Sequence, residues 1–118
     1  MTVASRILGT GACLALLVGV SAAWALDAAG EGRRVYLRVN CYGCHGGRVG
    51  GGMGPNFRSE RPDSGDIGEV VREGAEGGMP AYPTLTKTDI SNLGAYFKTL
   101  RTPAEPTFTH WWETVPTQ

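Results

Sequence analysis

The stretch that decides the fold is Cys41-Tyr42-Gly43-Cys44-His45. Side chains three residues apart lie on one face of a helical turn, so the Cys41 and Cys44 thiols can reach the same edge of a planar ligand. Each thiol can add to one of the two vinyl groups of a haem, and the His45 imidazole can bind its iron. This C-x-x-C-H pattern predicts covalent attachment of one c-type haem.

Other chemistries suit the two cysteines less well. A disulfide between them would close a tiny loop and would constrain the unfolded chain little. A zinc site needs a fourth ligand, and the sequence has no second cysteine pair and no well-spaced histidine. A thioredoxin-like redox pair belongs in a βαβ pattern, which this chain, with 18 Gly among 118 residues, lacks.

The first 25 residues are predicted to be a secretory signal. Residues 1–6 carry one positive charge, residues 7–20 are apolar or small, and Ala23-Trp24-Ala25 has the small-x-small form of a cleavage site. We therefore expect export to the periplasm and three parts: the signal at 1–25, one domain at 26–102 and a tail at 103–118. An uncleaved signal would leave residues 7–25 as a 19-residue candidate membrane anchor.

The charge balance excludes one class of partner. Cleavage removes Arg6 and no acidic residue, which leaves 10 basic against 11 acidic residues in 26–118. A nearly neutral chain has no basic stripe to neutralise phosphates, so nucleic acid is not an expected partner. Because a glycine-rich chain of this size buries little surface, we expect a covalently bound group to reinforce its core.

The iron needs a sixth ligand, and the candidates are Met53, Met79 and His110. Met53 follows His45 by only eight residues within a glycine-rich loop, too early to reach the opposite face of the haem. Met79 follows by 34 residues, after a predicted helix, and Pro80 stiffens its loop. Spacing therefore favours Met79, with Met53 as an apolar filler and His110 as a residue of the tail.

Helical periodicity appears first in residues 28–39. One stripe of this segment is apolar, with Val35, Tyr36 and Val39. The basic residues of the segment are expected to lie mostly in solvent: Arg33, Arg34 and Arg38.

Two more helices are predicted further along the chain. Residues 65–72 form a short apolar-faced segment that ends at Gly74. The next begins with Thr86 and Asp89, which resemble a capping box, and ends before Pro103. Its apolar positions recur at helical spacing: Ile90, Leu93, Phe97 and Leu100.

Together these segments resemble the class I monohaem cytochromes c over nearly all of residues 26–118. The resemblance rests on Gly54-Pro55-Asn56-Phe57, on Gly78-Met79-Pro80-Ala81-Tyr82, and on the pair Gly32 and Tyr36. It implies an all-α class I cytochrome c fold, with about three helices wrapped around one haem.

The resemblance also implies particular contacts. The Pro55 carbonyl would accept a hydrogen bond from His45, a role compatible with a simple turn at Pro55. The last helix would cross the first near Gly32. Tyr96 or Phe97 would then pack against Tyr36.

The implied function is one-electron transfer rather than catalysis, with His45 and Met79 as axial ligands. The run at 50–56 and the short ligand spacing look similar to small cytochromes associated with quinoprotein alcohol dehydrogenases. We expect a monomer that forms transient complexes with a dehydrogenase donor and a terminal oxidase or similar acceptor. The alternatives are a haem subunit bound permanently to an oxidoreductase and a haem sensor of gas or peroxide.

Two segments keep more than one interpretation. From 43 to 54, seven of twelve residues are glycine; these let the backbone pass close to the haem, or leave its edge open to a partner. In the tail, Phe108, Trp111 and Trp112 could pack on the core, cover the haem or anchor a partner.

Overall fold

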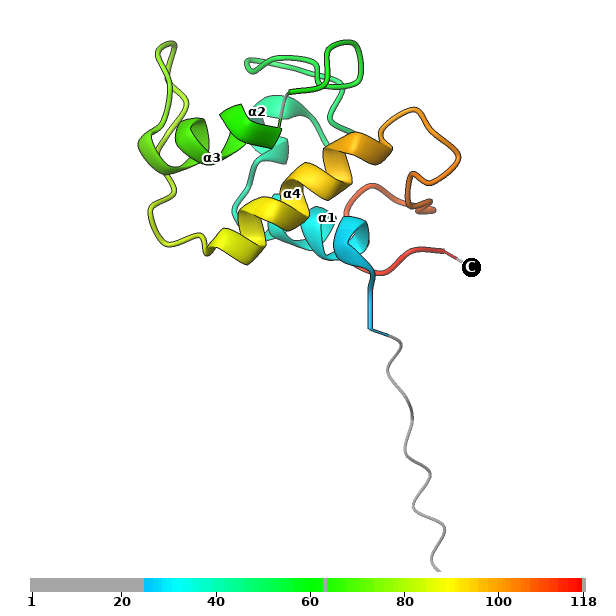
Figure 1. Cartoon of the computed structure of the whole chain (residues 1–118). Coiled ribbons are helices and arrows are strands. Elements are labelled where there is room, and N and C mark those ends of the chain that lie inside the picture. Colours follow the sequence, from blue (N-terminus) through cyan, green and yellow to red (C-terminus); the bar gives the residue numbers. More distant parts are fainter. Residues whose placement is uncertain (1–24, 63, 118) are drawn as a thin grey trace, which may run out of the picture.

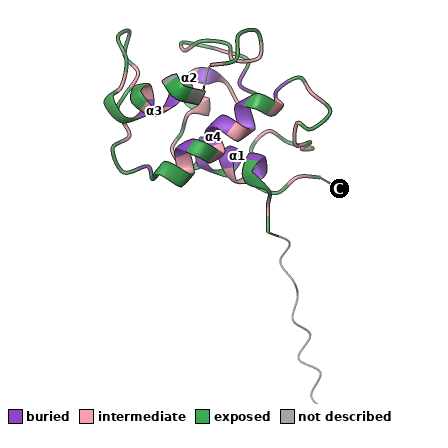
Figure 2. Ribbon diagram, in the orientation of Figure 1, coloured by how far each residue is buried: buried purple, intermediate pink, exposed green. Residues whose placement is uncertain are grey.

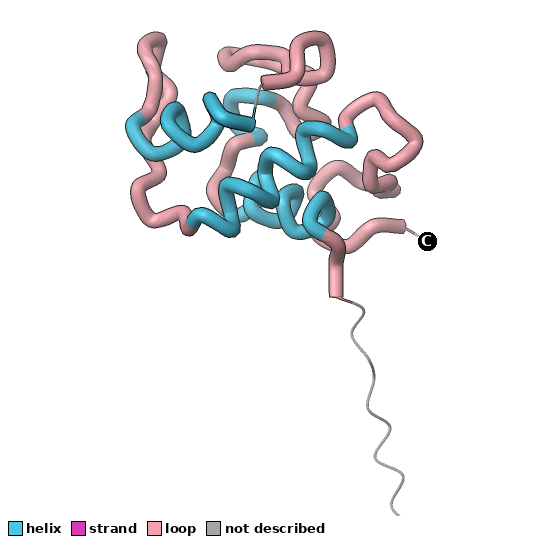
Figure 3. The backbone as a smooth tube through the Cα atoms, in the orientation of Figure 1, coloured by secondary structure: helices cyan, strands magenta, loops and turns pink. Residues whose placement is uncertain are grey.

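The computed structural model describes residues 25–62 and 64–117 (Figure 1). Four helices follow one another: α1 (Ala28–Arg38), α2 (Tyr42–His45), α3 (Ser64–Glu73) and α4 (Lys87–Thr99). Within the described residues there is no strand beyond an isolated bridge between Ala75 and Met79 (Figure 3). The prediction of an all-α fold is confirmed; α2 is the single turn that carries the cysteine motif.

The helix ends follow the local sequence. Asp27 caps α1 by accepting a 2.8 Å hydrogen bond from the Gly30 amide. Thr86 and Asp89 form the expected capping box at the start of α4, and Gly74 directly follows α3. The bounds of the three predicted helices are therefore correct to within three residues.

α1 and α4 cross in close contact, which Gly32 makes possible (Figure 1). A Cβ atom at Gly32 would lie 1.9 Å from the carbonyl oxygen of Asn92, closer than any side chain allows. Beside this crossing, the Tyr36 ring meets Tyr96 and Phe97 edge-on, at centroid distances of 5.9 and 6.1 Å. The expected contact pair is confirmed, and Tyr36 packs against both aromatic candidates.

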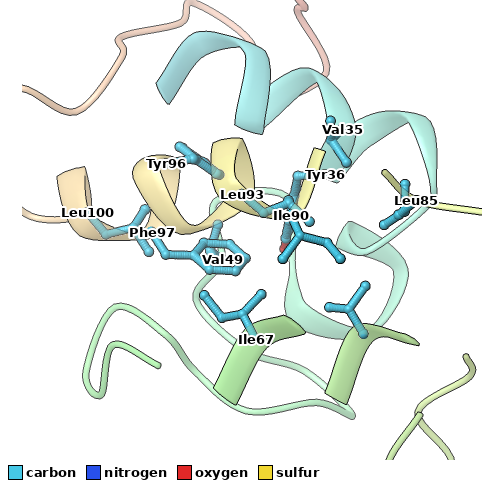
Figure 4. Close-up of a cluster of buried hydrophobic side chains, with 11 residues drawn as sticks. Val35, Tyr36, Val49, Ile67, Leu85, Ile90, Leu93, Tyr96, Phe97 and Leu100 are labelled. Atoms are coloured by element: carbon cyan, nitrogen blue, oxygen red, sulfur yellow. The ribbon is translucent and has the colours of Figure 1, made fainter. Parts of the chain in front are cut away.

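The core is small and gathers where α1, α3 and α4 face one another (Figures 2 and 4). Its fully buried side chains are Tyr36, Leu93, Leu100 and Val49. Val49 comes from the glycine-rich loop, so that loop is anchored to the core by an apolar side chain.

The exposure expected for Arg33 is wrong. Its side chain is buried, with only 3% exposed, whereas Arg34 and Arg38 are exposed as predicted. The tail, orange to red in Figure 1, folds back beside α1, and the Arg33 guanidinium donates hydrogen bonds to the carbonyl oxygens of Trp111 and Glu113. The same guanidinium lies 3.3 Å from the centroid of the Phe108 ring.

The predicted signal falls at residues 1–25, and residues 1–24 lie outside the described part of the chain. Among the described residues, no helix combines the length and the apolar character needed to span a bilayer.

Candidate functional site

A cavity of about 600 Å³ opens between α2, α3 and the loop that follows α3. Its volume lies within the range of roughly 300–1,000 Å³ that is usual for ligand sites. The cavity brings together all five residues expected at the site: Cys41, Cys44, His45, Pro55 and Met79.

His45 is held in one orientation. Its Nδ1 atom lies 3.0 Å from the carbonyl oxygen of Pro55; because a carbonyl only accepts, Nδ1 carries the proton and Nε2 keeps the lone pair that a metal needs. The Phe57 ring stacks on the imidazole at 4.5 Å. On another side Gly54 closes in, since a Cβ there would lie 2.8 Å from two imidazole atoms.

The two cysteines are free thiols on a single helical turn. The backbone fixes this turn, because the His45 amide donates to the Cys41 carbonyl at 2.9 Å. Burial raises the pKa of the Cys41 thiol to about 11, so the group is protonated at neutral pH. Among the described residues, no group of three or more His, Cys, Asp or Glu side chains is placed to hold a metal ion.

The three candidates for a sixth ligand lie in different places. Met79 lines the cavity and packs, half-buried, against the core. Met53 also borders the cavity but is 89% exposed, so the expectation that it fills apolar space is wrong. His110 does not line the cavity; it stacks on Trp112 at 4.6 Å.

The loop that carries Met79 is tied to α3. The Tyr82 amide donates to the Val71 carbonyl at 2.7 Å, and the Ala75 amide donates to the carbonyl of Met79 at 3.2 Å. These bonds hold Met79 beside the apolar face of α3. The loop therefore has one backbone hydrogen bond to α3, from Tyr82, and one within itself, from Ala75; the sequence indicated neither.

The cavity wall is mostly apolar. Among the described residues that line it there is no lysine, arginine or aspartate. Aliphatic and aromatic side chains form much of the surface, including Phe57, Ile67, Val70, Val71, Leu93 and Phe97. Two thiols, an imidazole and a thioether around such a wall are a donor set that suits an iron porphyrin attached through its vinyl groups.

Sequence reasoning missed two contacts at this site. Phe57 was identified only as part of a turn, although its ring covers the His45 imidazole. Trp111 packs outside the cysteine turn, 5.0 Å from the Tyr42 ring. An aromatic residue two positions after Pro55 was a usable signal for the first contact; no local pattern indicated the second.

Comparison with known families gives one finding. The family model described as cytochrome C oxidase, cbb3-type, subunit III matches residues 27–97. No curated protein and no solved structure matches the chain. The matched region contains α1 to α4 almost entirely and ends before the tail.

Proposed function

The chain belongs to the cytochrome c oxidase, cbb3-type, subunit III family of c-type cytochrome domains, and on that premise we propose that it carries single electrons through one haem bound covalently at Cys41 and Cys44. The family assignment makes it a haem-based electron carrier. Beyond the family assignment, we propose which residues attach the haem, which residues bind its iron and which proteins exchange electrons with it. The main support for this proposal is that one mostly apolar cavity is lined by Cys41, Cys44, His45, Pro55 and Met79.

The cysteines would fix the haem at one edge. Each thiol would add its S–H across one vinyl group of the haem, with sulfur bonding to one carbon and hydrogen to the other, and this addition would need no oxidant. The turn of α2 holds the two sulfurs on one face.

His45 and Met79 would bind the iron from opposite sides. The bound haem supplies an iron that alternates between the ferrous and ferric states. The Pro55 carbonyl accepts the Nδ1 proton of His45, which fixes the imidazole and raises its basicity. Met79 as the second ligand would raise the reduction potential relative to a nitrogen ligand, and it would occupy the position that a substrate would otherwise take.

A gas or peroxide sensor is less well supported. Such a site needs hydrogen-bond donors above an open iron position. Gly77, Gly78 and Pro80 beside Met79 carry no polar side chain. The polar side chains that line the cavity elsewhere include Asn40, Glu76 and Tyr82, and the Tyr36 hydroxyl already donates to the Gly46 carbonyl.

We propose the periplasm as the location, because c-type cytochrome domains are typically extracytoplasmic and the N-terminus resembles a signal. The proposed donor is a dehydrogenase and the proposed acceptor is a terminal oxidase or similar protein. A second candidate is permanent association with an oxidoreductase, which the family's description as an oxidase subunit favours. Size-exclusion chromatography of a native extract separates the two, since a free carrier elutes alone and a subunit co-elutes with a large enzyme.

The ligand assignment is tested by Met79→Ala, with Met53→Ala as the matched control. In the ferric protein, a methionine ligand gives a weak charge-transfer band near the red end of the spectrum. We expect Met79→Ala to abolish this band and Met53→Ala to keep it. Persistence of the band in Met79→Ala would reassign the ligand, and a pigment removed by acid–acetone would refute covalent attachment.

A further inference from the structure

The C-terminal tail is a closed loop that the family match does not include. The match ends at residue 97, whereas residues 107–117 fold into a loop of their own. The Thr117 amide donates to the Thr107 carbonyl at 2.8 Å, and the Thr109 amide donates to the Thr117 hydroxyl at 2.8 Å. This loop is therefore a defined element of this chain.

Arg33 holds the loop against α1. Its two terminal nitrogens donate to the carbonyl oxygens of Glu113 and Trp111, and its guanidinium lies over the Phe108 ring. Because this guanidinium is buried, its bonds are worth more than those of an exposed arginine. Arg33 thus fixes the backbone of Trp111 against α1.

The Trp111 side chain packs against residues 41–47, which we call the haem-attachment turn. The centroid of the Trp111 ring lies 5.0 Å from the centroid of the Tyr42 ring. Tyr42 stands between the two cysteines in the sequence. A Cβ atom at Gly47 would lie 2.5 Å from the Trp111 ring, so only a residue without a side chain leaves room there. The gap that remains between the tail and residues 47–48 has a volume of only about 20 Å³, room for about one water molecule.

The contact is made from outside the cavity. Cys41, Cys44 and His45 line the cavity, whereas Tyr42, Gly47 and Trp111 do not. The same stretch is tied from the inside, where the Tyr36 hydroxyl donates to the Gly46 carbonyl and the Gly51 amide donates to the His45 carbonyl at 2.8 Å. The turn that bears His45 is thus held between the core and the tail.

We propose that Trp111 is a positioning residue that braces the haem-attachment turn and that Arg33 holds this brace in place. The proposal rests on the proposed function. With the brace in place, residues 41–51 keep water away from His45, which is 7% exposed. Loss of the brace lets water approach, which stabilises the more highly charged ferric state and lowers the reduction potential.

The test compares Trp111→Ala with two matched variants. Trp111→Phe restores an aromatic ring, and Trp112→Ala removes the neighbouring tryptophan, which is 58% exposed. The measurements on the purified haem protein are the midpoint potential by spectroelectrochemistry and hydrogen exchange at the Gly51 amide. We expect Trp111→Ala to lower the potential and to speed this exchange by about tenfold, and Trp111→Phe to match the unsubstituted protein. The Trp112 ring meets Trp111 edge-on at 5.8 Å, so Trp112→Ala should change both quantities much less than Trp111→Ala.

A second variant decides the matter if Trp111→Ala fails to fold. In Gly47→Ala the added methyl would overlap the Trp111 ring and displace it from the haem-attachment turn. This variant should therefore lower the potential in the same way, although Trp111 itself is intact. An unchanged potential and exchange rate in the substituted proteins, or an equal change in Trp112→Ala, overturns the brace. Failure of the unsubstituted protein to show a reversible one-electron couple would instead refute the proposed function.

Discussion

The Nδ1 atom of His45 lies 3.0 Å from the carbonyl oxygen of Pro55, ten positions further along the chain. This bond decides which imidazole nitrogen is available to a metal. It depends on the loop between the two residues, because Gly54 passes so close to the ring that a Cβ atom would lie 2.8 Å from Nδ1 itself. The orientation of His45, the proposed iron ligand, therefore depends on the lack of a side chain at Gly54.

Gly54→Ala should displace the His45 ring. We expect a loss of about 1–3 kcal/mol in the free energy of unfolding, because the added methyl overlaps the imidazole. Weakening the bond to Pro55 makes His45 a less basic ligand, so the reduction potential should rise. Thermal unfolding and spectroelectrochemistry measure the two effects.

Gly50→Ala is the control for this loop. A Cβ at position 50 would meet nothing closer than Arg58 Cδ at 4.0 Å, so its stability should change by no more than about 0.5 kcal/mol. Equal effects of the two substitutions would mean that loop entropy, rather than the imidazole contact, explains the glycine at position 54.

The helices and the residues of the site could be predicted because each depends on short-range chemistry. Thr86 and Asp89 cap α4 through bonds within one turn, and Cys41, Cys44 and His45 lie on one turn as well. Spacing along the chain favoured Met79, whereas the role of the Pro55 carbonyl required the resemblance to a family, since spacing alone does not show which loop approaches His45.

Gly32→Ala should separate α1 from α4. The new methyl would lie 1.9 Å from a backbone oxygen of Asn92, which cannot rotate away as a side chain does. We expect the free energy of unfolding to fall by about 3 kcal/mol or more, measured by chemical denaturation of the haem protein.

Gly68→Ala, in α3, is the comparison for that substitution. Its Cβ would lie 3.4 Å from the flexible end of Arg72 and 3.8 Å from Ile90, both tolerable contacts. Because alanine favours the helix, stability should rise by up to about 1 kcal/mol. A similar loss for both variants would contradict a steric limit on side chains at the Gly32 crossing.

Burial of Arg33 could not be read from helical periodicity. The pattern of α1 assigns Arg33 to the polar face, and the residues that cover it lie about 80 positions later. Such coverage depends on carbonyl oxygens of the tail, and backbone groups leave no signature in the sequence. Packing of Trp111 was among the interpretations of the tail, but its partners Tyr42 and Gly47 could not be predicted, because they belong to a distant segment.

Arg33→Met should release the tail. The substitution keeps the length of the side chain but leaves two tail carbonyls without their donors, so we expect a loss of about 2–4 kcal/mol in the free energy of unfolding. Hydrogen exchange should also accelerate at the Thr117 amide, which closes the tail loop.

Arg38→Met serves as the reference for Arg33→Met. Arg38 pairs with Asp89 at 2.9 Å, but its side chain is 59% exposed, and such pairs contribute at most about 1 kcal/mol. A loss for Arg33→Met no larger than for Arg38→Met would mean that the buried bonds to the tail do not stabilise the fold.

Acid should weaken the contact between Arg58 and Glu105, a residue of the tail. Glu105 accepts hydrogen bonds from the Arg58 guanidinium at 2.5 and 3.0 Å and from the Arg101 amide at 2.7 Å. Partial burial opposes ionisation of Glu105, but these bonds outweigh it and hold the pKa of the carboxyl below its usual value of 4.5. A depressed pKa adds stability that is present above the ordinary value and is lost as the pH falls through the lowered one.

Glu105→Gln should therefore have a pH-dependent effect on the melting temperature. Above pH 4.5 the variant should melt below the unsubstituted protein, because the amide cannot form the charged pair with Arg58. As the pH falls further, Glu105 becomes protonated and the two melting curves should converge. Glu69→Gln, on an exposed position of α3, separates loss of this pair from loss of one negative charge. A melting difference for Glu105→Gln that stays constant through the acid range would show that the bonds to Arg58 and Arg101 do not depress the carboxyl pKa.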